Sequence, residues 1–125
     1  MESREKTILI VEDDDDIREL IEITLEDSQY CLRTASDGEV GLNAILLQRP
    51  DLVILDWIMP RLTGLEVLRK IRECPSTAGI PVIVLTSLTE VEHEEEVHSL
   101  GIFSYLQKPF SPLELIKTVQ EALAG

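Results

Sequence analysis

Carboxylates, a hydroxyl and an ammonium stand at the ends of the apolar runs of this sequence. They are, in chain order, Glu12, Asp13, Asp56, Thr86 and Lys108. If the apolar runs are neighbouring parallel strands, their carboxyl ends share one edge of the sheet and bring these side chains together. Such a convergence of separate segments says more about function than any one residue does.

The carboxylates of Glu12, Asp13 and Asp56 would repel one another at such an edge and raise one another's pKa. Two like charges about 4 Å apart cost on the order of 4 kcal/mol at an effective dielectric near 20. A hard divalent cation relieves this repulsion, and Mg²⁺ prefers one or two carboxylates together with water and a phosphate oxygen. We therefore predict a Mg²⁺ site. The acidic run continues through 14–16, where we expect a solvated helix N-terminus instead.

Asp56 is well placed to act as a nucleophile toward phosphorus if it lies beside a cation and opposite Lys108. Positive charges neutralise phosphoryl oxygens and keep the attacking carboxylate ionised. Thr86 could donate its hydroxyl to a phosphoryl oxygen. Each residue also has a plainer interpretation, since an aspartate at a strand end is often a cap and a threonine often ends a buried strand.

The segments that must position these residues are short apolar runs separated by stretches of helical length. The runs are 7–11, 30–34, 52–55, 81–85 and 102–106. Three of them are β-branched and apolar on both faces, as in strands buried inside a parallel sheet. Apolar residues at helical spacing predict helices that include 17–25, 40–47, 65–71 and 116–123, and a more weakly apolar one over 90–100.

Five successive βα units follow from this alternation. Strands joined by helix-length crossovers run parallel, with right-handed connections. We predict an α/β fold, a flavodoxin-like (βα)5 three-layer sandwich with strand order 2-1-3-4-5, whose ligand site lies between the first and third strands. Residues 1–125 are expected to be a single domain with its core at about 6–123 and no visible output domain.

The balance of charge argues against some partners. The chain has 125 residues and a net charge of -13, from 11 Lys+Arg against 24 Asp+Glu. Such a surface repels nucleic acid and anionic membranes. No apolar stretch approaches the roughly 20 residues that span a bilayer, and we do not expect the charged start at 1–6 to be a signal peptide. We expect a cytoplasmic protein that contacts neither nucleic acid nor membrane.

The sequence resembles the receiver domains of two-component response regulators over essentially its whole length. The motifs that carry the resemblance are Ile8–Asp13, Asp37-Gly38, Pro50–Pro60, Gly64, Pro81–Thr86 and Tyr105–Phe110. The resemblance implies a phosphorylation-dependent switch rather than an enzyme, with only self-catalysed phosphotransfer and slow autodephosphorylation. A sensor histidine kinase or histidine phosphotransfer protein would pass its phosphoryl group to Asp56, and the phosphorylated form would change partner binding.

The resemblance also implies roles for residues around the phosphoacceptor. Asp13 and Asp56 would bind Mg²⁺ directly, together with the main-chain carbonyl of Ile58, and Glu12 would assist through water. The partners implied downstream are an effector protein or an attached output domain, and a phosphorylation-dependent dimer is one arrangement that the family allows.

Three more residues receive roles from the family. Thr86 and Lys108 would contact the phosphoryl group. Tyr105 would be the switch aromatic, turning inward as the threonine moves toward the phosphate. The bond from Lys108 to Pro109 is of the X-Pro type, so it can be cis or trans, and the sequence leaves the isomer open.

The sequence departs from the family pattern at a few positions. Ile58 and Leu88, two residues beyond Asp56 and Thr86, are both apolar, so we expect them to crowd attacking water and to lengthen the phosphorylated lifetime. The segment expected as the fourth helix carries acids at 94–96 and no arginine. This argues against the dimer that alternating charges form in many DNA-binding regulators. Phe103 could instead form an apolar contact with a partner.

Other functions on similar scaffolds fit less well. A haloacid-dehalogenase-like phosphatase needs a second aspartate two positions after its nucleophile, where this chain has Ile58. A flavodoxin-type cofactor binder needs a phosphate loop after the first strand, and five consecutive acids there would repel the phosphate. A degenerate receiver, folded but not phosphorylated, would not need the complete set of acids, threonine and lysine.

Overall fold

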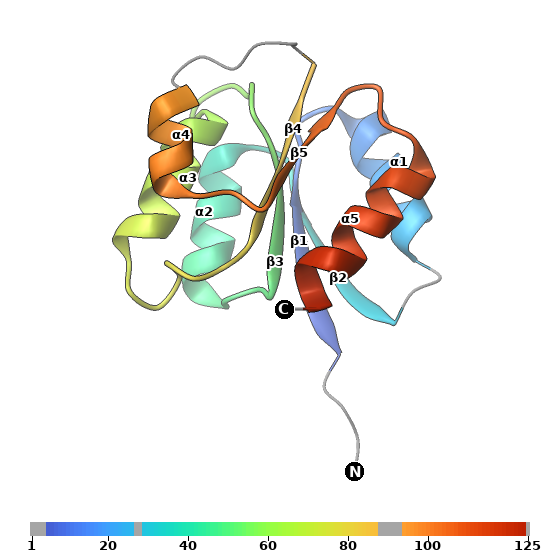
Figure 1. The fold of residues 1–125 in the computed structure, drawn as a ribbon, viewed down its shortest axis with the longest axis horizontal. Coiled ribbons are helices and arrows are strands. Elements are labelled where there is room, and N and C mark those ends of the chain that lie inside the picture. The colour runs from blue at the N-terminus through green and yellow to red at the C-terminus, as the bar shows by residue number, and fades with distance from the viewer. Residues whose placement is uncertain (1–4, 27–28, 88–93, 125) are drawn as a thin grey trace.

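The computed structural model describes residues 5–26, 29–87 and 94–124 (Figure 1). Its strands are β1 (Lys6–Val11), β2 (Tyr30–Ala35), β3 (Leu52–Asp56), β4 (Val82–Thr86) and β5 (Ser104–Gln107). Its helices are α1 (Asp15–Leu25), α2 (Gly38–Leu47), α3 (Gly64–Glu73), α4 (Glu94–Leu100) and α5 (Pro112–Ala124). In this part of the chain, no helix is long and apolar enough to cross a membrane.

The strands form one parallel sheet in the order β2-β1-β3-β4-β5, which confirms the predicted flavodoxin-like (βα)5 architecture. Helices α1 and α5 cover one face of this sheet, and α2, α3 and α4 cover the other (Figure 1). Alternate residues of each central strand join different core clusters: Leu9 faces α2 and α3, whereas Ile8 faces α1 and α5. Every residue of β3 and β4 is buried. Burial on both faces explains why these strands are continuously apolar.

Strand register places the predicted site residues at one edge of the sheet. Val11 pairs with Leu55, so the residues that follow β1 lie level with the end of β3. Asp56 pairs with Leu85, and Thr86 with Gln107, which brings the ends of β4 and β5 to the same level. The backbone of these strands therefore fixes where the side chains meet.

Helix α1 begins as the acidic run predicts. The carboxylate of Asp14 accepts hydrogen bonds from the backbone N–H groups of Asp16 and Ile17, and acidic residues fill the first turn. A carboxylate N-cap together with negative charge near a helix N-terminus stabilises the helix. The acids from Asp14 onward thus start a helix, whereas Glu12 and Asp13 stay in the loop beyond β1.

Helix α2 forms where it was predicted but turns a different face to the sheet. Of the three residues that give the segment its helical spacing, Ala44 packs against the core, but Val40 and Leu47 are 48% and 87% exposed. The buried face instead contains Gly41, where an added Cβ would lie only 2.8 Å from a methyl carbon of Val11. The helix comes so close to β1 that only glycine fits there, and a hydrophobicity pattern cannot show this.

Helix α4 is attached to α3 through both arginine contacts and apolar packing. The described helix begins at Glu94, so the earlier part of the segment expected at 90–100 lies outside the described residues. Val97 is its buried residue, and Arg69 of α3 forms a bidentate ion pair with Glu96. Arg72 donates to the carbonyls of Leu100 and Gly101, at 2.8 and 2.9 Å, at the end of the helix. Polar contacts therefore supplement a small apolar contact area.

Candidate functional site

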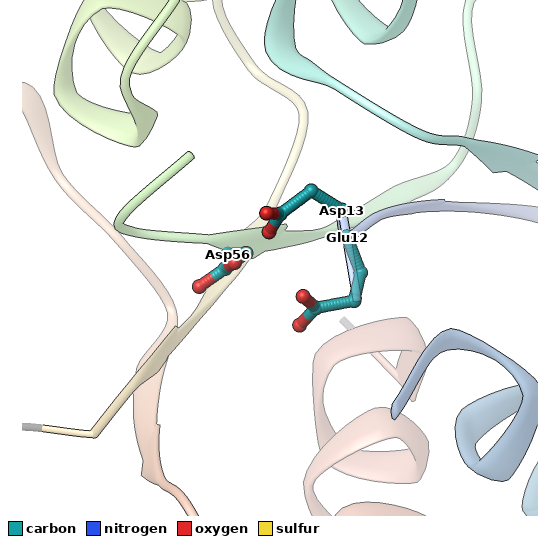
Figure 2. A group of neighbouring side chains, drawn as sticks. All are labelled: Glu12, Asp13 and Asp56. Carbon is teal, nitrogen blue, oxygen red and sulfur yellow. The ribbon is translucent and has the colours of Figure 1, made fainter. Parts of the chain in front are cut away.

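Three carboxylates converge at the carboxyl edge of the sheet. Oxygens of Glu12, Asp13 and Asp56 all lie within 4.8 Å of one another. Figure 2 shows the three side chains approaching from two neighbouring strand ends, with Glu12 and Asp13 reaching toward Asp56. Glu12 is 0% and Asp56 4% exposed, whereas Asp13 faces solvent. The convergence expected from the sequence is therefore present in the structure.

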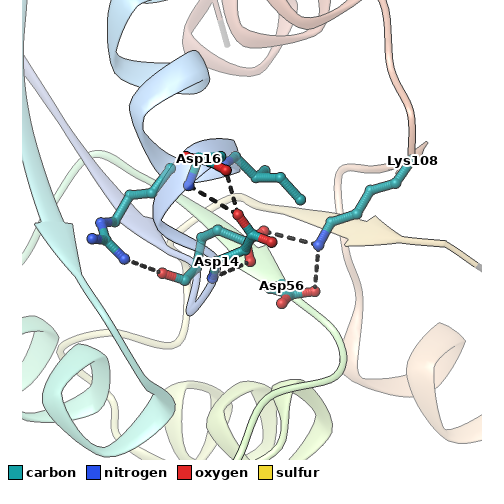
Figure 3. A network of polar contacts seen from close by, with 7 residues as sticks. Asp14, Asp16, Asp56 and Lys108 are labelled. Carbon is teal, nitrogen blue, oxygen red and sulfur yellow. Dashed lines mark hydrogen bonds and ion pairs between the residues drawn. The ribbon is translucent and has the colours of Figure 1, made fainter.

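An ammonium lies between two of these acids. Lys108 Nζ is 2.9 Å from Glu12 Oε1 and 3.1 Å from Asp56 Oδ1 (Figure 3). The lysine side chain is 16% exposed, and the Lys108–Pro109 peptide bond is cis. Among the described residues, Lys108 thus forms ion pairs with two of the three converging acids, Glu12 and Asp56.

The crowding of negative charge changes the protonation of the site. Burial, a hydrogen bond with Asp13 and the charge of Glu12 raise the pKa of Asp56 from its ordinary 3.8 to about 7, although Lys108 acts in the opposite direction. Burial by itself would lower the pKa of Lys108, but Glu12 and Asp56 outweigh it and raise that pKa. The lysine therefore stays positively charged, and it does not fully compensate the acids.

A cavity of about 250 Å³ opens over these groups. Its lining residues come from all the strand ends that the sequence singled out, and they are Glu12, Asp13, Asp14, Ile17, Asp56, Ile58, Thr86, Ser87 and Lys108. The structure thus brings together the predicted metal and phosphoryl residues. Tyr105 is the exception: it lines a separate cavity of about 310 Å³ with Val97 and Phe103, beside α4.

The turn after β3 is held close to the site by a glycine. The N–H of Gly64 donates to the carbonyl of Trp57 at 3.0 Å. A Cβ at position 64 would lie 2.7 Å from the carbonyl oxygen of Asp56 and 2.8 Å from Trp57 Cα. The first turn of α3 therefore packs directly on the backbone of Asp56, and only a residue without a Cβ fits at position 64.

Four residues near the site were missed as site residues by sequence reasoning. Asp14 was expected only to begin a helix, yet it lines the cavity. Ser87 and Ile17 line the cavity, and Arg18 donates to the carbonyl of Glu12 at 2.9 Å. The position of Ser87 directly after Thr86 was a usable signal. Ile17 was assigned to the apolar face of its helix, and nothing in the spacing of Arg18 points to a contact with the preceding loop.

The donor atoms of this site fit a hard divalent cation. All three converging side chains offer carboxylate oxygens, two of them from buried or nearly buried residues. Oxygen ligands are those that Mg²⁺ prefers, and an exposed third ligand leaves room for the waters that Mg²⁺ retains. A cation there would offset repulsion that Lys108 alone does not remove.

The raised pKa of Asp56 predicts an unusual pH dependence of stability. Its pKa of about 7 lies above the ordinary 3.8, so between these values the folded chain keeps a proton that the unfolded chain releases. Wild-type stability therefore falls as the pH rises through this window. Without divalent cations, we expect Asp56→Asn to be more stable than wild type at pH 8, by on the order of 1–3 kcal/mol. The difference should shrink toward about pH 4.

Urea unfolding at several pH values measures this difference. Glu19→Gln is the matched control, because it removes one negative charge from an exposed position of α1. We expect it to change stability by less than about 0.5 kcal/mol. An Asp56→Asn protein that is no more stable than wild type at pH 8 would contradict the crowding of charge described here.

Comparisons with known proteins place these features in a family. The chain matches the response regulator receiver domain over residues 8–120. It is 36% identical over 118 residues to the phosphate regulon transcriptional regulatory protein PhoB of Pseudomonas aeruginosa, covering 94% of this chain and 52% of that protein. It is 35% identical over 114 residues to an uncharacterized 14.6 kDa protein of Leptolyngbya boryana, covering 91% and 87% respectively.

Solved structures agree with the sequence comparison. The chemotaxis protein CheY4 of Vibrio cholerae has a TM-score of 0.88 at 34% identity, covering 96% of this chain and 100% of that chain. The chain spans about half the length of several curated relatives that it matches, such as PhoB at 52% and RpaA of Synechocystis at 48%. The family match runs from β1 into α5 and includes every strand end of the site. The chain therefore belongs to the response regulator receiver domain family of two-component systems.

Proposed function

We propose that this receiver domain is a switch that accepts a phosphoryl group on Asp56, in a Mg²⁺-dependent reaction, from a sensor histidine kinase or histidine phosphotransfer protein. The observation that carries the proposal is the position of Asp56, almost buried at the base of a polar cavity with Lys108 Nζ 3.1 Å from its carboxylate. Phosphorylation would change which effector protein or attached output domain the receiver binds. We expect this to take place in the cytoplasm, without direct contact with nucleic acid.

Each residue around Asp56 would contribute a different interaction to phosphoryl transfer. A carboxylate oxygen of Asp56 forms the new bond to phosphorus as the bond from phosphorus to the donor nitrogen breaks. Lys108 neutralises a phosphoryl oxygen, and the hydroxyl of Thr86, which lines the same cavity, donates to another. Asp56 and Asp13 would hold Mg²⁺ with the main-chain carbonyl of Ile58, and the bound ion would supply further positive charge.

The acids explain why the reaction would need a cation. Asp56 must be ionised to attack phosphorus, yet burial, Asp13 and Glu12 raise its pKa to about 7. A divalent cation between these carboxylates favours their ionised forms. It also offsets the charge that phosphorylation adds, about −1.5 to −2 near neutral pH. Binding of Mg²⁺ would therefore favour the ionised form of Asp56 before the reaction and stabilise the phosphorylated form after it.

A small phosphodonor tests the phosphoacceptor directly. With phosphoramidate and Mg²⁺, the wild-type chain should gain one phosphoryl group by intact mass, and removing Mg²⁺ with EDTA should prevent this. Asp56→Asn should not be labelled. Asp16→Asn removes an exposed acid from the first turn of α1, so it should be labelled like the wild type. An unlabelled wild type, or equal labelling of Asp56→Asn, would overturn the proposal.

Ile58 is expected to slow loss of the phosphoryl group. It lines the cavity and is 59% exposed, so its apolar side chain occupies space from which water would approach phosphorus. We expect Ile58→Asn to shorten the phosphorylated lifetime several-fold, measured as phosphate release after the donor is removed. Ile23→Asn is the control, since it changes an isoleucine of α1 that is 54% exposed and lies outside the cavity lining. Equal lifetimes for all three proteins would contradict this role. Leu88, assigned the same role, lies outside the described residues.

We expect phosphorylation of Asp56 to change the conformation of helix α4 and strand β5. Thr86 ends β4, the strand that pairs with β5, and Tyr105 lies on β5 beside the cavity next to α4. A threonine drawn toward a phosphoryl group would change the space available to Tyr105. A short helix with few apolar contacts can respond to such a change.

Amide hydrogen exchange with the phosphoryl mimic beryllofluoride measures this response. We expect exchange to change in α4 and β5 but not in α2, which covers the sheet next to β1 and β2. The Asp56→Asn protein, treated identically, is the control. Unchanged exchange throughout α4 and β5 in a wild type that binds beryllofluoride would remove these elements from the switch.

A further inference from the structure

We propose that Arg18 is a positioning residue for the cation site: its guanidinium holds the carbonyl of Glu12 and thereby fixes the directions of the Glu12 and Asp13 carboxylates. This inference rests on the proposed Mg²⁺ site. Among the described residues, the side chain of Arg18 donates to Glu12 and Asp15 and not to the proposed phosphoryl residues, and it does not line the cavity. It would therefore act through the loop and not on the reacting atoms.

The contact that supports this role is a hydrogen bond within one loop and helix. Arg18 Nη1 donates to the main-chain oxygen of Glu12 at 2.9 Å, and the arginine side chain is only 19% exposed. That oxygen belongs to the peptide group joining Glu12 to Asp13. Because the peptide group is planar, holding its carbonyl sets the rotation of the backbone on both sides. The two carboxylates that approach Asp56 project from these two residues (Figure 2).

Other bonds hold the ends of the same loop. The N–H of Glu12 donates to the carbonyl of Ala35 at 3.1 Å, which continues the pairing of β1 with β2. The N–H of Asp14 donates to Glu12 Oε2 at 3.0 Å, just before α1 begins. Arg18 acts on the peptide between these points. It therefore restrains the part of the loop that these two bonds leave able to rotate.

The second contact of Arg18 can be separated from the first. Arg18 Nη2 lies 2.5 Å from Asp15 Oδ1, but the Asp15 side chain is 84% exposed. Exposed ion pairs of this kind contribute little, about 0–1 kcal/mol. Removing the Asp15 carboxylate therefore tests the surface pair without removing the donor to the Glu12 carbonyl.

Electrostatics and positioning predict opposite results when Arg18 is replaced. A positive charge near a cation site repels the cation, so removing that charge should tighten Mg²⁺ binding if charge alone matters. Losing the support of the ligand-bearing loop should instead weaken binding, since groups that orient metal ligands typically contribute about 10–100-fold in affinity. The direction of the change therefore distinguishes the two effects.

Mg²⁺ titrations of the intact chain provide the test, with the fluorescence of Trp57 as the readout. Trp57 is the one tryptophan in the sequence and is next to Asp56. We expect Arg18→Met to raise the dissociation constant for Mg²⁺ at least about tenfold. Arg18→Lys keeps one donor and should restore part of the affinity. Asp15→Asn should stay within about twofold of wild type. Urea unfolding without Mg²⁺ identifies any general loss of stability.

Unchanged or tighter Mg²⁺ binding by folded Arg18→Met would overturn the positioning role, even if that protein unfolds at lower urea. If Arg18→Met does not fold, Arg18→Lys decides: an affinity equal to wild type, together with unchanged amide exchange at Asp13 and Asp14, would also overturn it. A wild type that binds no Mg²⁺ would overturn the proposed function itself. The two failures are therefore distinguishable.

Discussion

Repulsion among carboxylates at the carboxyl edge of the sheet is the constraint on which the rest of this site depends. Glu12 and Asp56 are buried together and face Asp13, and Lys108 is the ammonium that contacts them. In solution such groups would move apart, since like charges at this spacing cost several kcal/mol in a protein environment. Here the backbone prevents this, because the residues extend from strands whose register is fixed by a fully buried core.

This arrangement makes the site responsive to charge. A raised pKa of Asp56 means that the site holds a proton more readily than an isolated aspartate does. A divalent cation can take the place of that proton and leave Asp56 ionised. A phosphoryl group on Asp56 adds negative charge again, and the same cation together with Lys108 can compensate it. The repulsion among these carboxylates is therefore what would make cation binding and phosphorylation depend on each other.

Much of the fold and the site follows from the sequence because both depend on periodic features. The strands β3 and β4 are continuous apolar runs, so their burial and their parallel pairing could be predicted. Once the strands are parallel, Asp56 and Lys108 must lie at one edge. The family resemblance then assigned roles that geometry alone does not define, such as that of Tyr105.

Features set by close contacts between segments could not be predicted in this way. Gly41 determines which face of α2 packs on β1, against the hydrophobic spacing of that helix. Arg18 and Arg72 donate to main-chain carbonyls. Because every residue has such a carbonyl, the residue types do not show which one a side chain will contact. The isomer of the Lys108–Pro109 bond likewise became known only from the structure.

The central claim is that Asp56 becomes an acyl phosphate, and borohydride reduction tests it most directly. Borohydride converts an aspartyl phosphate to homoserine, which peptide mass spectrometry locates to a single position. After treatment with a phosphodonor and Mg²⁺, the account predicts homoserine at position 56 and at none of the neighbouring acids. Homoserine at Asp13 or another acid, or none in a chain that has taken up phosphate, would contradict it.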